Sequence, residues 1–149
     1  MANPKRSQRL QIVLQLAQQK EEAAQQELLQ AQTRLQQEQD KLVQLQQYQS
    51  EYLDNLKAQT GRQMSAMQYQ AMTQFINRLS VAISEQRRQV QLVGIALERV
   101  QAKWRQLYQK RQKMGDFIER CKMDEAREQD QREQRLMDEA SQRIAARRN

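Results

Sequence analysis

The side chains of this sequence that could take part in chemistry are carboxylates, basic groups and one thiol. The 149 residues include 18 acidic and 25 basic side chains, and there is no His. Imidazole acid–base catalysis and His-ligated metal sites are therefore excluded. The carboxylate pairs Glu21-Glu22 and Asp138-Glu139 fall on expected exposed helix faces, where solvated charge is the favoured interpretation. Without a Gly-rich phosphate loop as well, the sequence predicts no enzyme, metal, cofactor or small-molecule substrate.

Cys121 is the only cysteine, so an intrachain disulfide is impossible and a cytoplasmic protein is expected. Cys121 lies on the apolar line described below, which favours a buried structural thiol over a reactive one. The sequence has no run of eighteen apolar residues, and residues 1–9 lack the apolar block of a signal peptide. Neither a membrane span nor a secretory signal is therefore expected.

The composition is typical of long helices. There are 32 Gln but only three Gly and one Pro, and 5% of the residues are aromatic. Few turns are available, and a thick globular core would lack bulk. A prion-like Gln tract is the alternative interpretation, but it would lack an apolar periodicity.

Apolar residues recur at alternating spacings of four and three between residues 72 and 121. The positions are Met72, Ile76, Leu79, Ile83, Gln86, Val90, Val93, Leu97, Val100, Trp104, Leu107, Arg111, Met114, Ile118 and Cys121. Only Gln86 and Arg111 are not apolar. The mean spacing of 3.5 residues predicts the seam of a left-handed coiled coil.

A second seam precedes it, with eleven apolar residues among fourteen positions. The positions are Leu10, Leu14, Ala17, Glu21, Ala24, Leu28, Ala31, Leu35, Glu38, Leu42, Leu45, Gln49, Tyr52 and Leu56. Successive d positions are occupied by Ala17, Ala24 and Ala31, whose small side chains let a bulkier facing helix come close.

Residues that typically begin or end helices occur before the first seam and between the two seams. Asn3-Pro4 is a helix start, with Asn as the N-cap and Pro at the first helical position. Thr60-Gly61 ends the first helix, and Ser65 with Gln68 forms a capping box for the next. A short connection between two long apolar seams favours an antiparallel hairpin.

We therefore expect an all-α fold, a long antiparallel two-helix coiled-coil hairpin with an overhanging C-terminal helix. The expected single domain, residues 1–149, has a first helix at about 4–60, a turn at 61–64 and a second helix at about 65–145. Facing residues would have numbers that add to 121 or to 128. We prefer 128, which places small Ala24 opposite large Trp104, although a slip of one heptad stays open.

The end of the second helix, residues 122–149, is predicted to be an unpaired charged extension. Residues 124–134 are polar with mixed charge, and Leu136, Met137 and Ile144 are the only large apolar residues near the end. Such a helix is marginal alone, so it would fray or dock on a partner. Gly115-Asp116 is a candidate weak point just before it.

The positive charge is concentrated in one part of the chain. Residues 61–121 carry eleven basic and four acidic side chains, whereas the segments on either side are balanced. In a hairpin the basic N-terminus folds back beside this part. We call the resulting set the basic cluster: Lys5, Arg6, Arg9, Lys110, Arg111, Lys113 and Arg120. It is either a solvated face or, as we favour, a docking surface for an acidic partner; no nucleic acid is expected, since no base-reading motif is present.

Aromatic residues stand off the seam near the expected turn. Tyr48 and Phe75 both fall at g, and g positions face each other in an antiparallel pair. With their neighbours they form what we call the aromatic patch: Leu45, Tyr48, Tyr52, Phe75, Leu79 and Ala82. The rings either lap over the seam or form a contact surface.

Three segments resemble a known family. Residues 48–56 (YQSEYLDNL), residues 74–83 (QFINRLSVAI) and residues 137–143 (MDEASQR) are similar to FliJ, a small coiled-coil protein of the bacterial flagellar type III export apparatus. The length, the two-helix plan and the longer second arm agree with that family. Gln86 departs from it, since a His is expected there in relatives.

The resemblance implies a non-enzymatic stalk. Such proteins insert the open end of the hairpin into the export ATPase hexamer and promote its assembly. The aromatic patch would contact the cytoplasmic domain of the export-gate membrane protein, and export chaperones would bind as well. The chain would then be cytoplasmic and peripherally associated with the inner membrane at the flagellar base. ATPase contacts are not transferable one by one, and we expect them in the basic cluster.

Two alternatives remain. One is the equivalent stalk or escort protein of a virulence type III secretion system. The other, less favoured, is a nucleic-acid-associated coiled coil, which retention on DNA at physiological salt would support.

Overall fold

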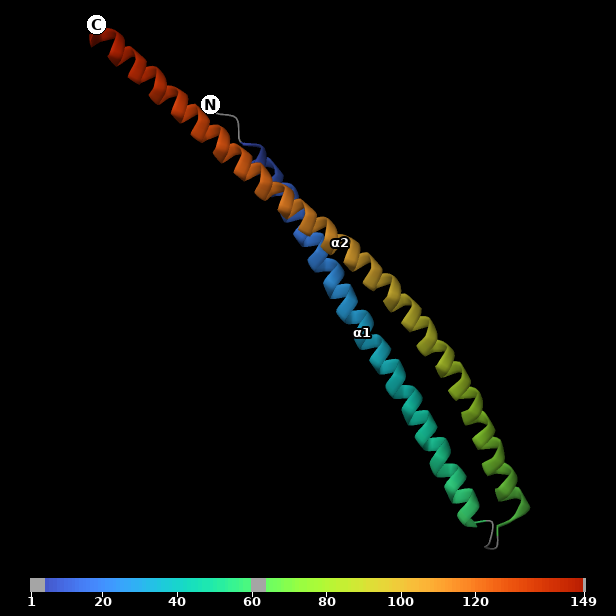
Figure 1. Ribbon diagram of the computed structural model, residues 1–149. Helices are drawn as coiled ribbons and strands as arrows, with labels where there is room; N and C mark the ends of the chain where they lie inside the picture. Colours follow the sequence, from blue (N-terminus) through green and yellow to red (C-terminus); the bar gives the residue numbers. More distant parts are fainter. Residues whose placement is uncertain (1–4, 60–63, 149) are drawn as a thin grey trace. The chain divides into compact units, whose positions relative to one another are not determined.

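The computed structural model describes residues 5–59 and 64–148, and within these ranges it contains two long helices and no strand (Figure 1). Helix α1 spans Arg6–Gln59 and helix α2 spans Ala66–Arg148. The expected all-α helical hairpin is confirmed. The predicted start at Asn3-Pro4 and stop at Thr60-Gly61 lie outside the described residues.

Helix α2 begins at the predicted capping box. The main-chain N–H of Gln68 donates to the Ser65 hydroxyl at 3.1 Å, and the Ser65 N–H donates to the Gln68 side-chain carbonyl at 3.3 Å. These two bonds satisfy donors that have no partner inside the helix. The helix then continues through Gly115-Asp116, the candidate weak point, without a break and without a left-handed glycine.

Both predicted seams are the buried faces of their helices. All fifteen seam positions of α2 are buried or half-buried, and so are those of α1 with the exception of Tyr52. Ala24 is only 2% exposed and Trp104, expected opposite it, is half-buried. The 3.5-residue periodicity therefore identified the packed faces correctly.

The chain divides into two compact units. Unit 2, Ala24–Trp104, contains the two helix segments on either side of residues 60–63, which run antiparallel (from blue through green to yellow in Figure 1). Its cross-helix pairs include Gln49–Ser80, Tyr52–Phe75, Glu27–Lys103 and Glu38–Gln86, whose numbers add to 129, 127, 130 and 124. Three of these sums lie within two of the preferred 128 and the fourth lies between 121 and 128, because side chains reach a few residues to either side.

Unit 1, Met1–Ala23 and Arg105–Asn149, pairs the start of α1 with the second half of α2. Arg111 forms a salt bridge with Glu21, and Ser7 bonds to Glu125. In the register that adds to 121, Glu21 would be level with Val100, about 16 Å along the helix from Arg111 at 1.5 Å per residue. The contacts of unit 1 therefore also favour 128. The expected single-domain boundaries stay a prediction.

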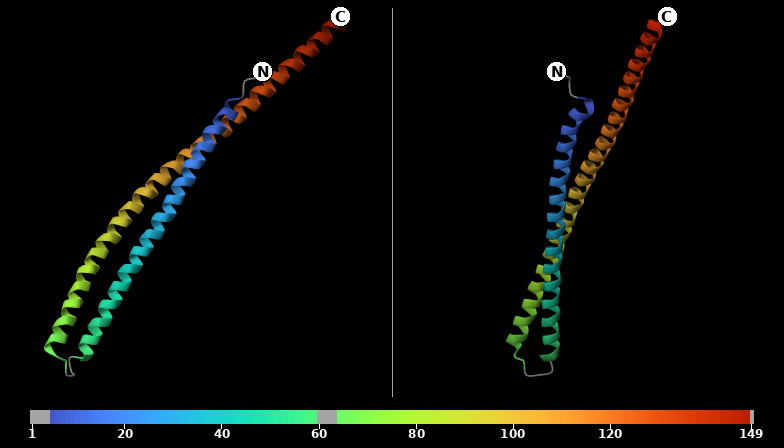
Figure 2. Two further views of the ribbon diagram at one scale, coloured as in Figure 1. Left: turned by 180° about the vertical axis from the view of Figure 1, so that it is seen from behind. Right: turned by 90° about the vertical axis from the view of Figure 1, so that its left-hand side faces the viewer.

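The last part of α2 extends past the start of α1, as both views in Figure 2 show. Every residue from Ala126 to Arg148 is exposed. Leu136, Met137 and Ile144 are 65%, 70% and 57% exposed. Within unit 1, this segment therefore adds helix without adding buried core.

Candidate functional site: an aromatic patch and a basic cluster

The aromatic patch lies in unit 2, and its rings come from both helices. Tyr52 and Phe75 are in contact, with ring centroids 4.6 Å apart and planes tilted by 54°. Tyr48 lies one turn from Tyr52 on the same face of α1. Tyr48, Tyr52 and Phe75 are 53%, 37% and 40% exposed. The two helices therefore present three half-exposed rings on one flank.

The aliphatic members of the patch form its base. Leu79 is 9% exposed, and Leu45 and Ala82 are half-buried. Leu79 belongs to the seam, so the base is fixed by coiled-coil packing rather than by a loop. Rings held above a rigid base lose little conformational freedom on binding, which is the property of an interface hot spot. The patch offers apolar contact and two phenol hydroxyls.

The basic cluster lies entirely in unit 1, and six of its seven members are exposed. The guanidinium of Arg6 stands over the Phe117 ring, 5.2 Å from its centroid. Among the described residues, no carboxylate lies within 4 Å of the amino groups of Lys110 and Lys113 or of the Arg120 guanidinium. These cations are free to meet an acidic surface.

Arg111 differs from the rest of the cluster. It is half-buried on the seam, where it forms a salt bridge with Glu21 and stands 5.2 Å from the centroid of the Tyr108 ring. Glu21 and Arg111 are two of the residues that interrupt the apolar seams. Their pairing gives Arg111 a role inside the coil, whether or not it also meets a partner. Charge reversal at Arg111 would therefore disturb folding.

A second pair of seam interruptions meets in unit 2. The Gln86 side-chain amide donates to the carboxylate of Glu38 at 2.6 Å and to its main-chain carbonyl at 2.9 Å. The bond from Gln86 lowers the pKa of Glu38 below its ordinary value, and the nearby Lys41 ammonium acts in the same direction. Gln86 is thus engaged inside the coil and is not part of the aromatic patch.

Sequence reasoning missed the contact that caps α1 in the described structure. The Ser7 hydroxyl and the Ser7 N–H both donate to the Glu125 carboxylate, at 2.6 Å and 3.0 Å. These bonds lower the pKa of Glu125. A carboxylate of α2 thereby satisfies a donor in the first turn of α1, where negative charge is favourable. The only available signal was that Ser7, three residues before Leu10, and Glu125, four residues after Cys121, continue the spacing of the two seams.

Among the described residues, the possible metal ligands, the possible membrane spans and the single thiol define no further site. No three His, Cys, Asp or Glu side chains in residues 5–59 and 64–148 gather in a way that could hold a metal ion. Neither helix, over its described length, is apolar enough to cross a bilayer. Cys121 is a free thiol and is half-buried, so it is less enclosed than predicted.

The fold and these surfaces define a helical coiled-coil protein whose exposed groups are suited to contacts with other proteins. The family model described as "Flagellar FliJ protein" matches residues 6–149. The chain therefore belongs to the FliJ family and is a component of the flagellar export apparatus. None of the curated proteins or solved structures compared with the chain gave a match.

Proposed function

We propose that this protein is a non-catalytic connector of the flagellar export apparatus. Its basic cluster binds the hexameric export ATPase and promotes assembly of the ring. Its aromatic patch binds the cytoplasmic domain of the export-gate membrane protein. Export chaperones are further partners, and the protein acts in the cytoplasm against the inner membrane at the flagellar base.

The observation that carries the proposal is the aromatic patch itself. Tyr48 and Phe75, beside the apolar seam, and Tyr52, on the seam itself, are 53%, 40% and 37% exposed. Exposed rings above the buried Leu79 are typical of a protein interface. Membership of the FliJ family supports the gate domain as the partner.

The support for the ATPase contact is electrostatic. Lys110, Lys113 and Arg120 are exposed cations of one unit, and none of them has a carboxylate within 4 Å among the described residues. Clustered charge of one sign steers an oppositely charged partner and raises its association rate. The exposed end of α2, which is helical to Arg148, adds a second surface for the ATPase.

The virulence-system alternative has less support, because the matching family model is a flagellar one. No specific observation favours nucleic acid, since the three exposed rings of the aromatic patch lie in unit 2, whereas the 38% exposed Phe117 ring of unit 1 already lies under the Arg6 guanidinium of the basic cluster. Single-stranded nucleic acid binding combines cations with stacking rings in one groove.

The test measures the affinity of the purified chain for the ATPase and for the gate domain separately. Phe75→Ala is expected to weaken gate binding about tenfold or more, as truncation of an interface hot spot does, and to leave ATPase binding unchanged. Tyr69→Ala is the matched control, because Tyr69 is 48% exposed and lies outside the aromatic patch.

The complementary variant carries Lys110→Glu and Lys113→Glu and keeps Arg111, so that the salt bridge to Glu21 is preserved. It is expected to lose ATPase binding at low salt, with a smaller difference from wild type at high salt. Reversal of the exposed Arg87 and Arg88 in unit 2 controls for net charge. Equal loss of both partners in both variants would refute the assignment of separate surfaces.

A further inference from the structure

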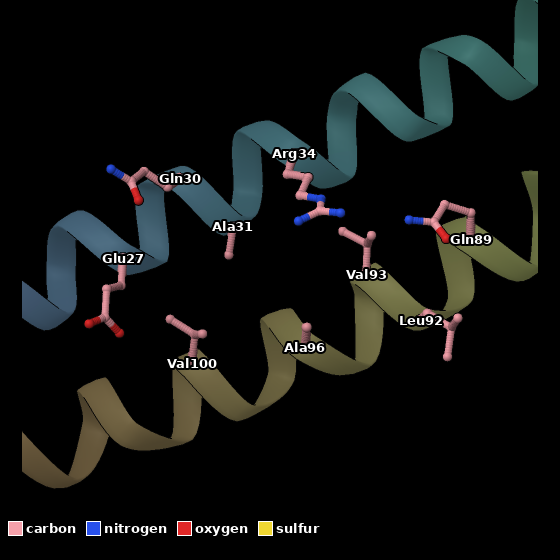
Figure 3. A pocket seen from close by; sticks show the side chains of 9 residues that line it. All are labelled: Glu27, Gln30, Ala31, Arg34, Gln89, Leu92, Val93, Ala96 and Val100. Carbon is pink, nitrogen blue, oxygen red and sulfur yellow. The ribbon is translucent and has the colours of Figure 1, made fainter.

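A groove of 520 Å³ lies between α1 and α2 in unit 2 (Figure 3). Its lining residues come from both helices: Glu27, Gln30, Ala31, Arg34, Gln89, Leu92, Val93, Ala96 and Val100. None of these residues belongs to the aromatic patch or to the basic cluster.

The groove exists because two small side chains occur at the same level of the coil. Figure 3 shows Ala31 pointing from α1 toward α2, where Ala96 stands opposite. A coiled coil is packed by large side chains that fill holes between four residues of the facing helix. On the flank where the groove opens, Ala31 and the exposed Ala96 contribute only methyl groups, and Leu97, the seam residue level with Ala31, does not line the groove, so side-chain volume is missing on this flank. The walls on either side are the apolar Val93 and Val100.

The groove is also open to a partner on its outer side. Leu92 lines it and is 52% exposed. An exposed Leu beside an unfilled apolar hole resembles half of a helix-packing site, in which the missing half is a third helix. Helices α1 and α2 form the two walls of the groove, and the hole lies between them. This shape fits a helix with one projecting side chain better than it fits an extended strand.

The two charged residues at the ends of the groove differ in whether they already form an ion pair within the protein. Glu27 stands at the Val100 end, where its carboxylate is 3.5 Å from the Lys103 ammonium. Arg34 stands at the other end, and its guanidinium points toward the space beside Val93. No described carboxylate lies within 4 Å of the Arg34 guanidinium, whose attraction to the Glu38 carboxylate, one turn along α1, acts without a direct ion pair. The available charge of the groove is therefore positive.

We propose that this groove binds an amphipathic α-helix of a partner protein. That helix inserts one bulky apolar side chain between Ala31 and Ala96, and it places a carboxylate about one turn away against Arg34. The shape of the hole selects the apolar group, and the Arg34 guanidinium selects the sign of the charge. This site is separate from the two surfaces of the proposed function.

The probe is a synthetic three-heptad helical peptide with Leu at a and d and Glu along one flank, labelled for fluorescence anisotropy. The full chain is expected to bind it saturably. Ala96→Leu fills the hole from within, so it should weaken binding about tenfold or more while the melting temperature does not fall. Arg34→Glu should weaken binding by about tenfold, the loss expected for a hydrogen bond to a charged group.

Two controls give the result its specificity. Arg88→Glu changes the same charge on an exposed residue outside the groove and should leave peptide affinity unchanged. A peptide with Lys in place of Glu should bind Arg34→Glu better than wild type. Equal binding to wild type, Ala96→Leu and Arg34→Glu would overturn the proposal. So would self-association of the wild-type chain that Ala96→Leu abolishes, since the occupant would then be a second copy. Neither outcome depends on ATPase or gate binding.

Discussion

Gln86 of α2 reaches across the coil to Glu38 of α1, with its amide nitrogen 2.6 Å from the carboxylate and 2.9 Å from the main-chain carbonyl oxygen. Glu38 is only 9% exposed, and the Lys41 ammonium lies 3.4 Å from its other carboxylate oxygen. Both residues occupy seam positions that are otherwise apolar. Because hydrogen bonds are directional whereas apolar packing is not, we expect this pair to fix the register in unit 2.

The first prediction concerns this pair. Gln86→Leu removes both hydrogen bonds and leaves the Glu38 carboxylate on the seam, so it should lower the urea midpoint of unfolding. The double variant Glu38→Leu with Gln86→Leu places apolar groups on both sides and should recover or exceed the wild-type midpoint. Circular dichroism at 222 nm follows the transition. Gln91→Leu, at an exposed position, is the control. A double variant less stable than Gln86→Leu would contradict the assigned pairing.

The second prediction concerns pH. The pKa values of Glu38 and Glu125 lie below the ordinary value of 4.5 in the folded protein, because hydrogen bonds from Gln86 and Ser7 favour the ionised forms. Their stabilising contribution is therefore complete above about pH 4.5 and is lost as the pH falls through the lowered values. The free energy of unfolding should decrease as the pH is lowered from 7 to 3.

The variant that tests this origin is Glu38→Gln combined with Glu125→Gln. Its urea midpoint should fall less steeply between pH 5 and pH 3 than that of the wild type. An unchanged slope would show that other carboxylates control the acid response.

The third prediction uses the two glycines inside α2. A Cβ added at Gly94 or Gly115 meets no atom within 4 Å, and neither residue has a positive φ. Gly115→Ala and Gly94→Ala should each stabilise the protein by about 1 kcal/mol, the usual difference between these residues within a helix. Chemical unfolding of the single variants and of their combination measures it. Destabilisation by Gly115→Ala would contradict this prediction and would indicate that the helix departs from regular geometry at residue 115.

Much of the fold follows from sequence because a 3.5-residue period admits few structures. Leu35, Ile83 and Ile118 are seam residues by spacing alone, and the structure places them on the packed faces. The capping box at Ser65 was predictable for a similar reason, since it involves residues only three apart. Local periodicity and local capping need no knowledge of the partner helix.

The cross-helix polar contacts could not be predicted with the same security. The sequence showed that Glu21, Glu38, Gln86 and Arg111 interrupt the seams, but it left the sums 121 and 128 both open. Which interruption meets which depends on that register and on how far each side chain reaches along the coil. The groove beside Ala31 was missed for the same reason, because Ala96 lies at a g position and becomes relevant only once the two helices are aligned.

The central claim is that one chain joins the ATPase to the gate through separate surfaces. It is tested most directly by immobilising the gate domain and measuring how much ATPase it retains with and without the chain. We predict retention with the wild-type chain, and its loss with Phe75→Ala or with the Lys110→Glu and Lys113→Glu variant. Competition between the ATPase and the gate domain for the wild-type chain, or equal retention without the chain, would contradict the account.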